Sequence, residues 1–231
     1  MTPDSDHDLH RISEVLRNAG ITFWLDSGTL LGMVRDGQLL RGDPDIDLSV
    51  WDTDVPVLLG LAETFRSGGY RCRVESYFGQ VFNVTLVPRL GSGRRRIDVC
   101  VYRRSEGHAW APALLPRTRK GRRDTGRLRL LAPWDMLLHA LWARFARGLM
   151  VERWPWRGFF RLKTWWIPLE FLDAIEEHEG SGLPVPQGSA EYLAYRYGRW
   201  QSPVDDWSYW DDDGGLAPAD PRVLVANEGR A

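Results

Sequence analysis

The segment that runs from Trp24 to Val50, WLDSGTLLGMVRDGQLLRGDPDIDLSV, constrains the fold of this 231-residue chain more than any other. Its pattern predicts a short strand, a turn, a short helix and then a second strand. Side chains alternate between the two faces of a strand, so Asp45 and Asp47 share one face while Ile46 and Leu48 point into a core. The segment therefore predicts an α/β unit in which two carboxylates lie side by side above an apolar layer.

Two carboxylates in contact repel each other, and folds tolerate such a pair mainly where a cation lies between them. The turn before them, Ser27-Gly28-Thr29, offers backbone N–H groups and hydroxyls that suit phosphate oxygens. The alternative is a solvated acidic turn at Gly42–Asp45. However, the acids continue into an apolar strand, where acidic residues are otherwise unfavourable. The pattern therefore favours a metal site next to a phosphate-binding turn, as in phosphoryl and nucleotidyl transfer.

The order and spacing of these motifs resemble the LicD/fukutin-related family of the nucleotidyltransferase superfamily, in which a GGTLLG-type turn precedes a PWDDDID-type strand. This chain has SGTLLG at 27–32, Val-Arg at 34–35 and DPDID at 43–47. It departs from the family pattern at Arg41-Gly42, where the family has Pro-Trp, and at Pro44, which replaces the middle acid. The resemblance implies an α/β (α+β) fold, with a nucleotidyltransferase-like mixed sheet, flanking helices and a mainly helical C-terminal part.

A third carboxylate, Asp98, lies in the alternating segment Arg96–Tyr102. In the family resembled, a carboxylate on a later, neighbouring strand joins the first pair around the metal, and Asp98 fits that place. The alternative is a strand residue that pairs with Arg96. The resemblance implies that Asp45, Asp47 and Asp98 hold one or two Mg²⁺ ions, or Mn²⁺ in their place.

Four further residues are candidates for binding the phosphates of a donor. Ser27, Gly28 and Thr29 would do so through backbone and hydroxyl donors. Arg35 follows on the same short helix and would clamp a phosphate oxygen with both of its arms.

A second group of motifs near the C-terminus resembles the closing signature of the same family. It comprises LPVP at 183–186, EYL at 191–193, YRYGRW at 195–200, and Pro203. Taken alone, this aromatic-rich helix indicates packing rather than chemistry. Because both groups of motifs occur in the family order, the resemblance spans about residues 8–210.

Periodicity gives the remaining organisation. The predicted helices are 5–18, 55–65, 133–149, 159–178 and 189–197, and the predicted strands are 21–25, 45–51, 70–77, 81–87 and 96–102. We expect a catalytic core over 1–130, a helical part of the same domain over 131–213, and a disordered tail over 214–231.

Composition excludes several classes of protein. A net charge of −1 provides no global basic field for nucleic acid. The cysteines, Cys72 and Cys100, lack metal-ligand spacing and read as reduced core residues. The polar N-terminus argues against a signal peptide, and no apolar run is long enough to cross a bilayer. These features predict a cytoplasmic protein.

Two stretches leave alternatives open. The basic loop over 118–126 would hold donor phosphates or an anionic acceptor, or pair with the acidic region 205–213. The stretch 153–171 mixes tryptophans with arginines, which suits peripheral contact with the inner face of the membrane, or packing on the core.

The function that the resemblance implies is metal-dependent phosphotransfer. A phospho-alcohol, such as phosphocholine or ribitol phosphate, would pass from a CDP-linked donor to a sugar of a glycan or glycolipid, with Asp98 as the first candidate for the proton acceptor. The alternative is a nucleotidyltransferase that moves a nucleoside monophosphate from an NTP to a small-molecule acceptor. A second alternative is a non-catalytic descendant that binds nucleotide or glycan.

Overall fold

The computed structural model describes residues 4–77, 80–116, 160–204, 207 and 212–218. The chain divides into two compact units, Met1–Ala113 with Lys163–Ala231, and Leu114–Leu162. Most of the second unit lies outside the described residues. The elements that position the candidate site belong to the first unit.

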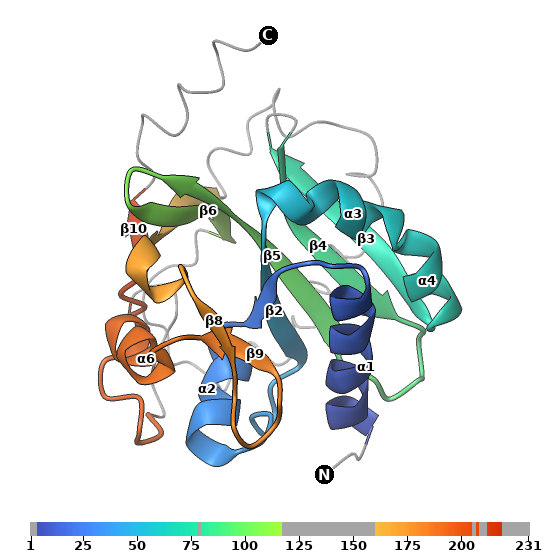
Figure 1. Cartoon of the computed structure of the whole chain (residues 1–231), viewed down its shortest axis with the longest axis horizontal. Coiled ribbons are helices and arrows are strands. Elements are labelled where there is room, and N and C mark those ends of the chain that lie inside the picture. Colours follow the sequence, from blue (N-terminus) through green and yellow to red (C-terminus); the bar gives the residue numbers. More distant parts are fainter. Residues whose placement is uncertain (1–3, 78–79, 117–159, 205–206, 208–211, 219–231) are drawn as a thin grey trace, which may run out of the picture. The chain divides into compact units, whose positions relative to one another are not determined.

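A mixed sheet forms the centre of the first unit (Figure 1). Its described strands are β1 (Phe23–Leu25), β2 (Asp45–Trp51), β3 (Tyr70–Tyr77), β4 (Gln80–Pro88), β5 (Arg96–Ser105), β6 (His108–Pro116), β7 (Phe160–Pro168) and β10 (Leu216–Pro218). The path through the sheet is β1-β2-β5-β6-β7-β10, and β4 pairs with both β3 and β5. β2 and β5 run parallel to each other, whereas β1–β2, β3–β4 and β4–β5 are antiparallel pairs.

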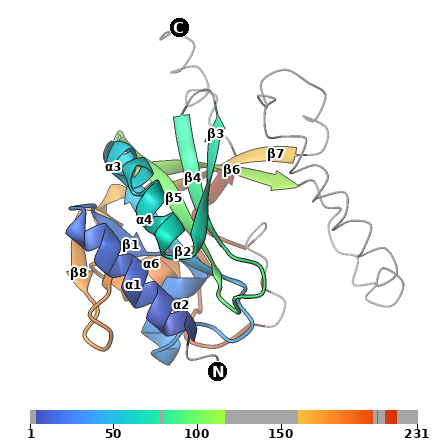
Figure 2. The same ribbon diagram turned by 90° about the vertical axis from the view of Figure 1, so that its right-hand side faces the viewer.

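Helices and a hairpin complete the described fold. The helices are α1 (Asp4–Asn18), α2 (Ser27–Asp36), α3 (Val55–Gly60), α4 (Ala62–Ser67) and α6 (Ser189–Tyr197), with short 3₁₀ turns at Asp52–Asp54 and Leu169–Phe171; the hairpin joins β8 (Ile175–Glu177) to β9 (Pro184–Pro186). The two views agree that α1, α3 and α4 lie on one face of the sheet (Figures 1 and 2).

Alternation along β2 and β5 explains this arrangement. Ile46, Leu48 and Val50 are almost fully buried, as are the residues opposite them on β5, Ile97, Val99 and Val101. Together with Leu9, Ile12 and Leu16 of α1 they belong to one apolar core. Each such side chain contributes about 1.5–3 kcal/mol of burial free energy, so this face fixes the register of the sheet. The intervening residues, among them Asp45, Asp47 and Asp98, lie on the opposite face.

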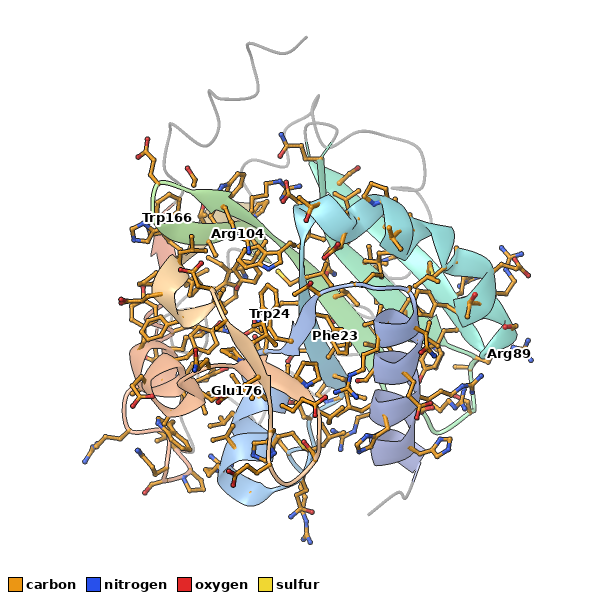
Figure 3. The ribbon with its side chains drawn as sticks, viewed as in Figure 1. Phe23, Trp24, Arg89, Arg104, Trp166 and Glu176 are labelled. Atoms are coloured by element: carbon orange, nitrogen blue, oxygen red, sulfur yellow. The ribbon has the colours of Figure 1, made fainter. Side chains whose placement is uncertain are left out.

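An aromatic cluster packs on this second face of the sheet. Trp24 lies opposite Ser49 on β2, and its ring contacts those of Trp51 and Tyr102, with centroids 5.0 and 5.9 Å apart. Phe23, next to it on β1, lies opposite Val50 and so faces the helices (Figure 3). The aromatic cluster therefore lies on the same face of the sheet as Asp45 and Asp47, at the opposite end of β2.

The predicted strands 45–51 and 70–77 and the helix 189–197 are confirmed with the same bounds. The predicted helix 55–65 is interrupted at Leu61, which separates α3 from α4. The helix predicted over 133–149 and the basic loop at 118–126 lie outside the described residues.

The helix predicted over 159–178 is wrong. Residues Phe160–Pro168 form β7, followed by a 3₁₀ turn and β8. The segment is rich in Phe, Thr, Trp and Ile, which favour a pleated, half-buried surface over a helix. The described part of the C-terminal region is therefore not mainly helical, although the α/β mixed-sheet fold class with flanking helices is confirmed.

The disordered tail predicted over 214–231 does not begin at Gly214. Leu216–Pro218 forms β10, which pairs with β7, and Gly215 is buried. The rest of the tail lies outside the described residues. No helix among the described residues is long and apolar enough to cross a membrane.

Candidate functional site

The candidate site begins where β1 ends and α2 starts. Asp26 is the N-cap of α2, and its carboxylate accepts a hydrogen bond from the Ser27 N–H over 2.7 Å. Ser27 has a φ of 48°, in the left-handed region that L-residues seldom occupy. Glycine takes this conformation without strain, which explains why the related motif has Gly at this place. The backbone of the turn is thus held in a conformation that its sequence does not favour on its own.

Two glycines of SGTLLG are required by close contacts. A Cβ atom at Gly28 would lie 2.5 Å from Asp43 Oδ2, and one at Gly32 would lie 2.6 Å from the Gln38 carbonyl oxygen. Without a side chain at Gly28 the turn can approach the acids. Without one at Gly32 the chain can fold back from α2 toward β2.

Three carboxylates gather beside this turn. Asp43, Asp45 and Asp47 each place an oxygen within 4.8 Å of the others. Asp45 and Asp47 belong to β2, whereas Asp43 precedes the strand, after a turn in which Gly42 has a φ of 83°. The predicted metal ligands Asp45 and Asp47 are therefore brought together, and Asp43 joins them although it was not predicted as a site residue.

The carboxylates are held at a cost in electrostatic free energy. Desolvation, then a side-chain hydrogen bond with Asp45 and repulsion from it, raises the pKa of Asp43 to about 6. Desolvation and then Asp45, Asp43, Asp26 and Asp98 raise the pKa of Asp47 well above its ordinary value. A bound divalent cation would reverse this unfavourable interaction, because it stabilises the ionised carboxylates.

Asp98 lies opposite Asp47 in the parallel β2–β5 register. Its Oδ2 atom is 2.8 Å from Arg96 Nη2, and the same guanidinium also contacts Asp45. The Arg96 pairing considered at the sequence level is thus present, and Asp98 stands beside the group of three. Its role at the metal stays a prediction.

The residues predicted to bind phosphate have definite protein contacts. The Thr29 hydroxyl is buried and accepts the Asp47 N–H over 2.8 Å. Arg35 donates from Nε and Nη2 to Asp36, over 3.0 and 2.8 Å. It lines a hollow of about 410 Å³ formed by Arg35, Asp36 and 38–41. Thr29 thus ties α2 to β2, and a phosphate at Arg35 would have to compete with Asp36.

A buried ionic network of Arg196, Asp26 and Asp213 contacts the turn at Ser27. Arg196, on α6, is 2% exposed. Its Nη1 donates to Asp26 Oδ1 over 2.7 Å and to Ser27 Oγ over 3.2 Å, and its Nη2 donates to Asp213 Oδ2 over 2.6 Å. The guanidinium also lies 4.6 Å from the centroid of the Trp165 ring. The sequence offered one local signal for this network, an Asp at a helix N-cap, and none that linked it to Arg196.

The donor set fits a hard divalent cation. Carboxylate oxygens are the protein ligands that Mg²⁺ and Mn²⁺ prefer, and Mg²⁺ is commonly held by one or two of them with water and substrate phosphate. Gly28, without a side chain, lets the turn approach Asp43 closely. The described residues bring together three carboxylates that fit a cation and the N-terminal turn of α2, a combination that suits chemistry at a diphosphate.

The chain matches a family model and several known proteins over part of its length. Residues 20–115 match the family model described as LicD/FKTN/FKRP, nucleotidyltransferase domain. The ribitol-5-phosphate transferases FKTN of Mus musculus and Homo sapiens are each 24% identical over 178 residues, which cover 77% of this chain and 32% of the relative. The ribitol 5-phosphate transferase FKRP of Mus musculus is 44% identical over 41 residues, or 18% of this chain and 8% of the relative.

The chain spans about a third of the length of the FKTN relatives that it matches. Among solved structures, a lincomycin-bound lincosamide antibiotic adenylyltransferase aligns with a TM-score of 0.44 and 11% identity, over 85% of this chain and 91% of that chain. A likeness of this size supports no inference about function.

Proposed function

We propose that this chain, whose residues 20–115 match the LicD/FKTN/FKRP family model, is a member of the LicD/fukutin-related family and transfers a phospho-alcohol from a CDP-linked donor to a sugar of a glycan or glycolipid. The transferred phospho-alcohol would be ribitol phosphate or phosphocholine. The relatives are ribitol 5-phosphate transferases, which supports ribitol phosphate. The observation that carries the proposal is the group Asp43, Asp45 and Asp47 against Gly28, inside the segment that matches the family.

The proposed reaction exchanges one phosphorus–oxygen bond for another. The acceptor hydroxyl oxygen bonds to the phosphorus that carries the alcohol, the bond from that phosphorus to the bridging oxygen breaks, and CMP leaves with that oxygen. Asp98, with a side chain 22% exposed, is our candidate for accepting the hydroxyl proton. The Ser27 hydroxyl and the N–H groups of Gly28 and Thr29 would bind the donor phosphates, because the Ser27 N–H already donates to Asp26.

A divalent cation, Mg²⁺ or Mn²⁺, held by Asp43, Asp45 and Asp47 would supply charge neutralisation for the diphosphate. Without it, carboxylates and phosphates would repel each other at the distances that transfer requires. We further propose a cytoplasmic location with peripheral membrane contact, which the aromatic and basic stretch 153–171 suggests.

Calorimetric titration with CDP-ribitol, CDP-choline, CTP and ATP, with and without Mg²⁺, tests the proposal. We expect Mg²⁺-dependent binding of one CDP-alcohol, and CMP as the released product when an acceptor glycan is supplied. Asp47→Asn should abolish both, and Asp173→Asn, which changes an exposed carboxylate, is the matched control. Release of pyrophosphate from CTP or ATP would instead favour nucleotidyl transfer, and binding without any turnover would favour the non-catalytic alternative.

A further inference from the structure

The buried network around Arg196 connects three parts of the chain that are far apart in sequence. Asp26 follows β1 as the N-cap of α2, Arg196 lies in the last turn of α6, and Asp213 lies just before β10. All three side chains are almost fully buried. Only Asp26 falls within 20–115, so the network joins the segment that matches the family to residues beyond it.

Asp26 links Arg196 to the acidic group through hydrogen bonds. Its carboxylate also accepts hydrogen bonds from Ser49 Oγ over 2.7 Å and from the Tyr192 hydroxyl over 2.9 Å. Its backbone N–H donates to the Asp47 carbonyl over 3.2 Å. One residue therefore binds Arg196 through its side chain and a member of the acidic group through its backbone.

Arg196 also contacts the strained residue directly. Ser27 has its φ at 48°, and its Oγ is the second acceptor of Arg196 Nη1. A residue in the left-handed region persists only where its surroundings hold it there. The next residue, Gly28, lies against Asp43, so a rotation of the Ser27 backbone would move the turn away from the acids.

We propose that Arg196 is a positioning residue: through Asp26 and Ser27 it fixes the turn at Gly28 against the acidic group, where the phosphates of the donor bind. The inference rests on the proposed function for the identity of the ligand. Asp213 belongs to the same device, because it holds the guanidinium from the opposite side at Nε and Nη2. A buried ion pair that served stability alone would be replaceable by apolar residues, and it would not need contacts to two consecutive residues of one turn.

The test compares R196K with R199K, which changes an exposed arginine of the same segment. A lysine keeps the charge but loses the planar fork that reaches Asp26, Ser27 and Asp213 together. We expect R196K to lower kcat with the CDP-alcohol by roughly 10–100-fold, to weaken Mn²⁺ binding by a similar factor, and to leave the acceptor KM within about twofold. R199K should match the wild type in all three measurements.

The S27G background supplies a readout that a purely structural role would not change. Glycine adopts the left-handed conformation unaided, so the penalty of R196K on kcat should be several-fold smaller in S27G than in the wild type. An R196K protein with a lower melting temperature but wild-type kcat and Mn²⁺ affinity would overturn the proposal. An R196K penalty of the same size in S27G would overturn the route through Ser27.

Failure of the proposed function can be told apart from failure of this inference. If the wild type released no CMP from any CDP-alcohol, the function would fall, and the Mn²⁺ affinities of wild type, R196K and R196K/S27G would still test Arg196. If the wild type bound no Mn²⁺ either, there would be no site to position and both would be overturned.

Discussion

Arg196 Nη1 lies 2.7 Å from Asp26 Oδ1, although the two residues are 170 positions apart in the sequence. The side chains are 2% and 3% exposed, so this is a charge pair withdrawn from water. Asp213, with a fully buried side chain, adds a second carboxylate to the same guanidinium. The result is one cation between two anions, a set in which the loss of the cation leaves both carboxylates uncompensated.

We therefore expect Arg196→Met to lower the free energy of unfolding by about 3–5 kcal/mol. The methionine fills part of the volume but cannot compensate Asp26 or Asp213. Urea denaturation followed by circular dichroism measures the change, with Arg199→Met as the exposed control. A loss no larger than that of the control would show that the network does not stabilise the fold.

The pH dependence of stability should report the acidic group. The pKa of Asp43 is raised to about 6, mainly by desolvation and then by Asp45. A raised pKa in the folded state means that the contribution of this group to stability is fully present below its unfolded pKa, near 4, and is lost as the pH rises through about 6. Metal-free protein should therefore become less stable between about pH 4 and pH 7.

Asp43→Asn should flatten this dependence and raise the stability of the metal-free protein at pH 7, because the variant has no carboxylate to ionise at this place. Addition of Mg²⁺ at pH 7 should stabilise the wild type and not the variant, because the cation binds the ionised folded form. Thermal melts at several pH values provide the measurement. A wild-type curve that rises with pH over this range would contradict the expected sign.

Gly28→Ala tests whether the turn must touch the acids. The new Cβ would lie 2.5 Å from Asp43 Oδ2, so the turn or the carboxylate has to move. We expect the affinity for Mn²⁺ and the turnover to fall by roughly tenfold or more, as for other displaced metal supports. Gly60→Ala is the matched control, because a Cβ there meets nothing within 4 Å and the residue is helical. Equal behaviour of the two variants would remove the argument for a cradle at Gly28.

Several helices and strands of this fold could be predicted from the sequence, because they follow from hydrophobic periodicity and from the residues that begin and end each element. Alternation gave the bounds of β2 and β3, and the apolar face of α1 predicted its position to within one residue. β7 was mistaken for a helix because aromatic residues interleaved with basic residues fit either period over a short stretch. Its partner β10 is about 50 residues away, and no local signal announces such a pairing.

The site could be predicted only as far as strand geometry reaches. Asp45 and Asp47 follow from alternation on one strand. Asp43 was missed because it lies before the strand, and its approach depends on the left-handed turn at Gly42. Arg196 was missed because the contact that matters runs to Asp26 on a distant element. Sequence reasoning places residues within elements, whereas these two contacts depend on how elements meet.

Substitution of Asp43 and substitution of Asp98 should affect Mn²⁺ binding and turnover differently. Asp43 belongs to the group of three that fits a cation, so Asp43→Asn should weaken Mn²⁺ binding and lower turnover together, by roughly 100-fold or more in the rate. Asp98 is paired with Arg96, and as a proton acceptor it should affect kcat by about 10²–10⁴-fold while Mn²⁺ binding changes little. Titration of Mn²⁺ by electron paramagnetic resonance, beside steady-state kinetics, separates the two. Loss of Mn²⁺ binding in Asp98→Asn would instead return Asp98 to the metal site.

A chain that ends at Asp213 should be less stable than one that ends at Pro218. The longer chain keeps β10, in which Leu216 lies opposite Trp165, and the hydrogen bonds from Gly214 N to the Arg196 carbonyl and from Trp166 N to the Gly215 carbonyl, at 2.9 and 2.8 Å. The longer chain also keeps the hydrogen bond that the Gly215 N–H donates to Asp213 Oδ1. This bond orients the carboxylate toward Arg196. With these bonds worth about 0.5–1.5 kcal/mol each, their joint loss should lower the melting temperature by several degrees. Equal melting temperatures of the two chains would show that residues 214–218 do not support the fold, and that Asp213 holds Arg196 without them.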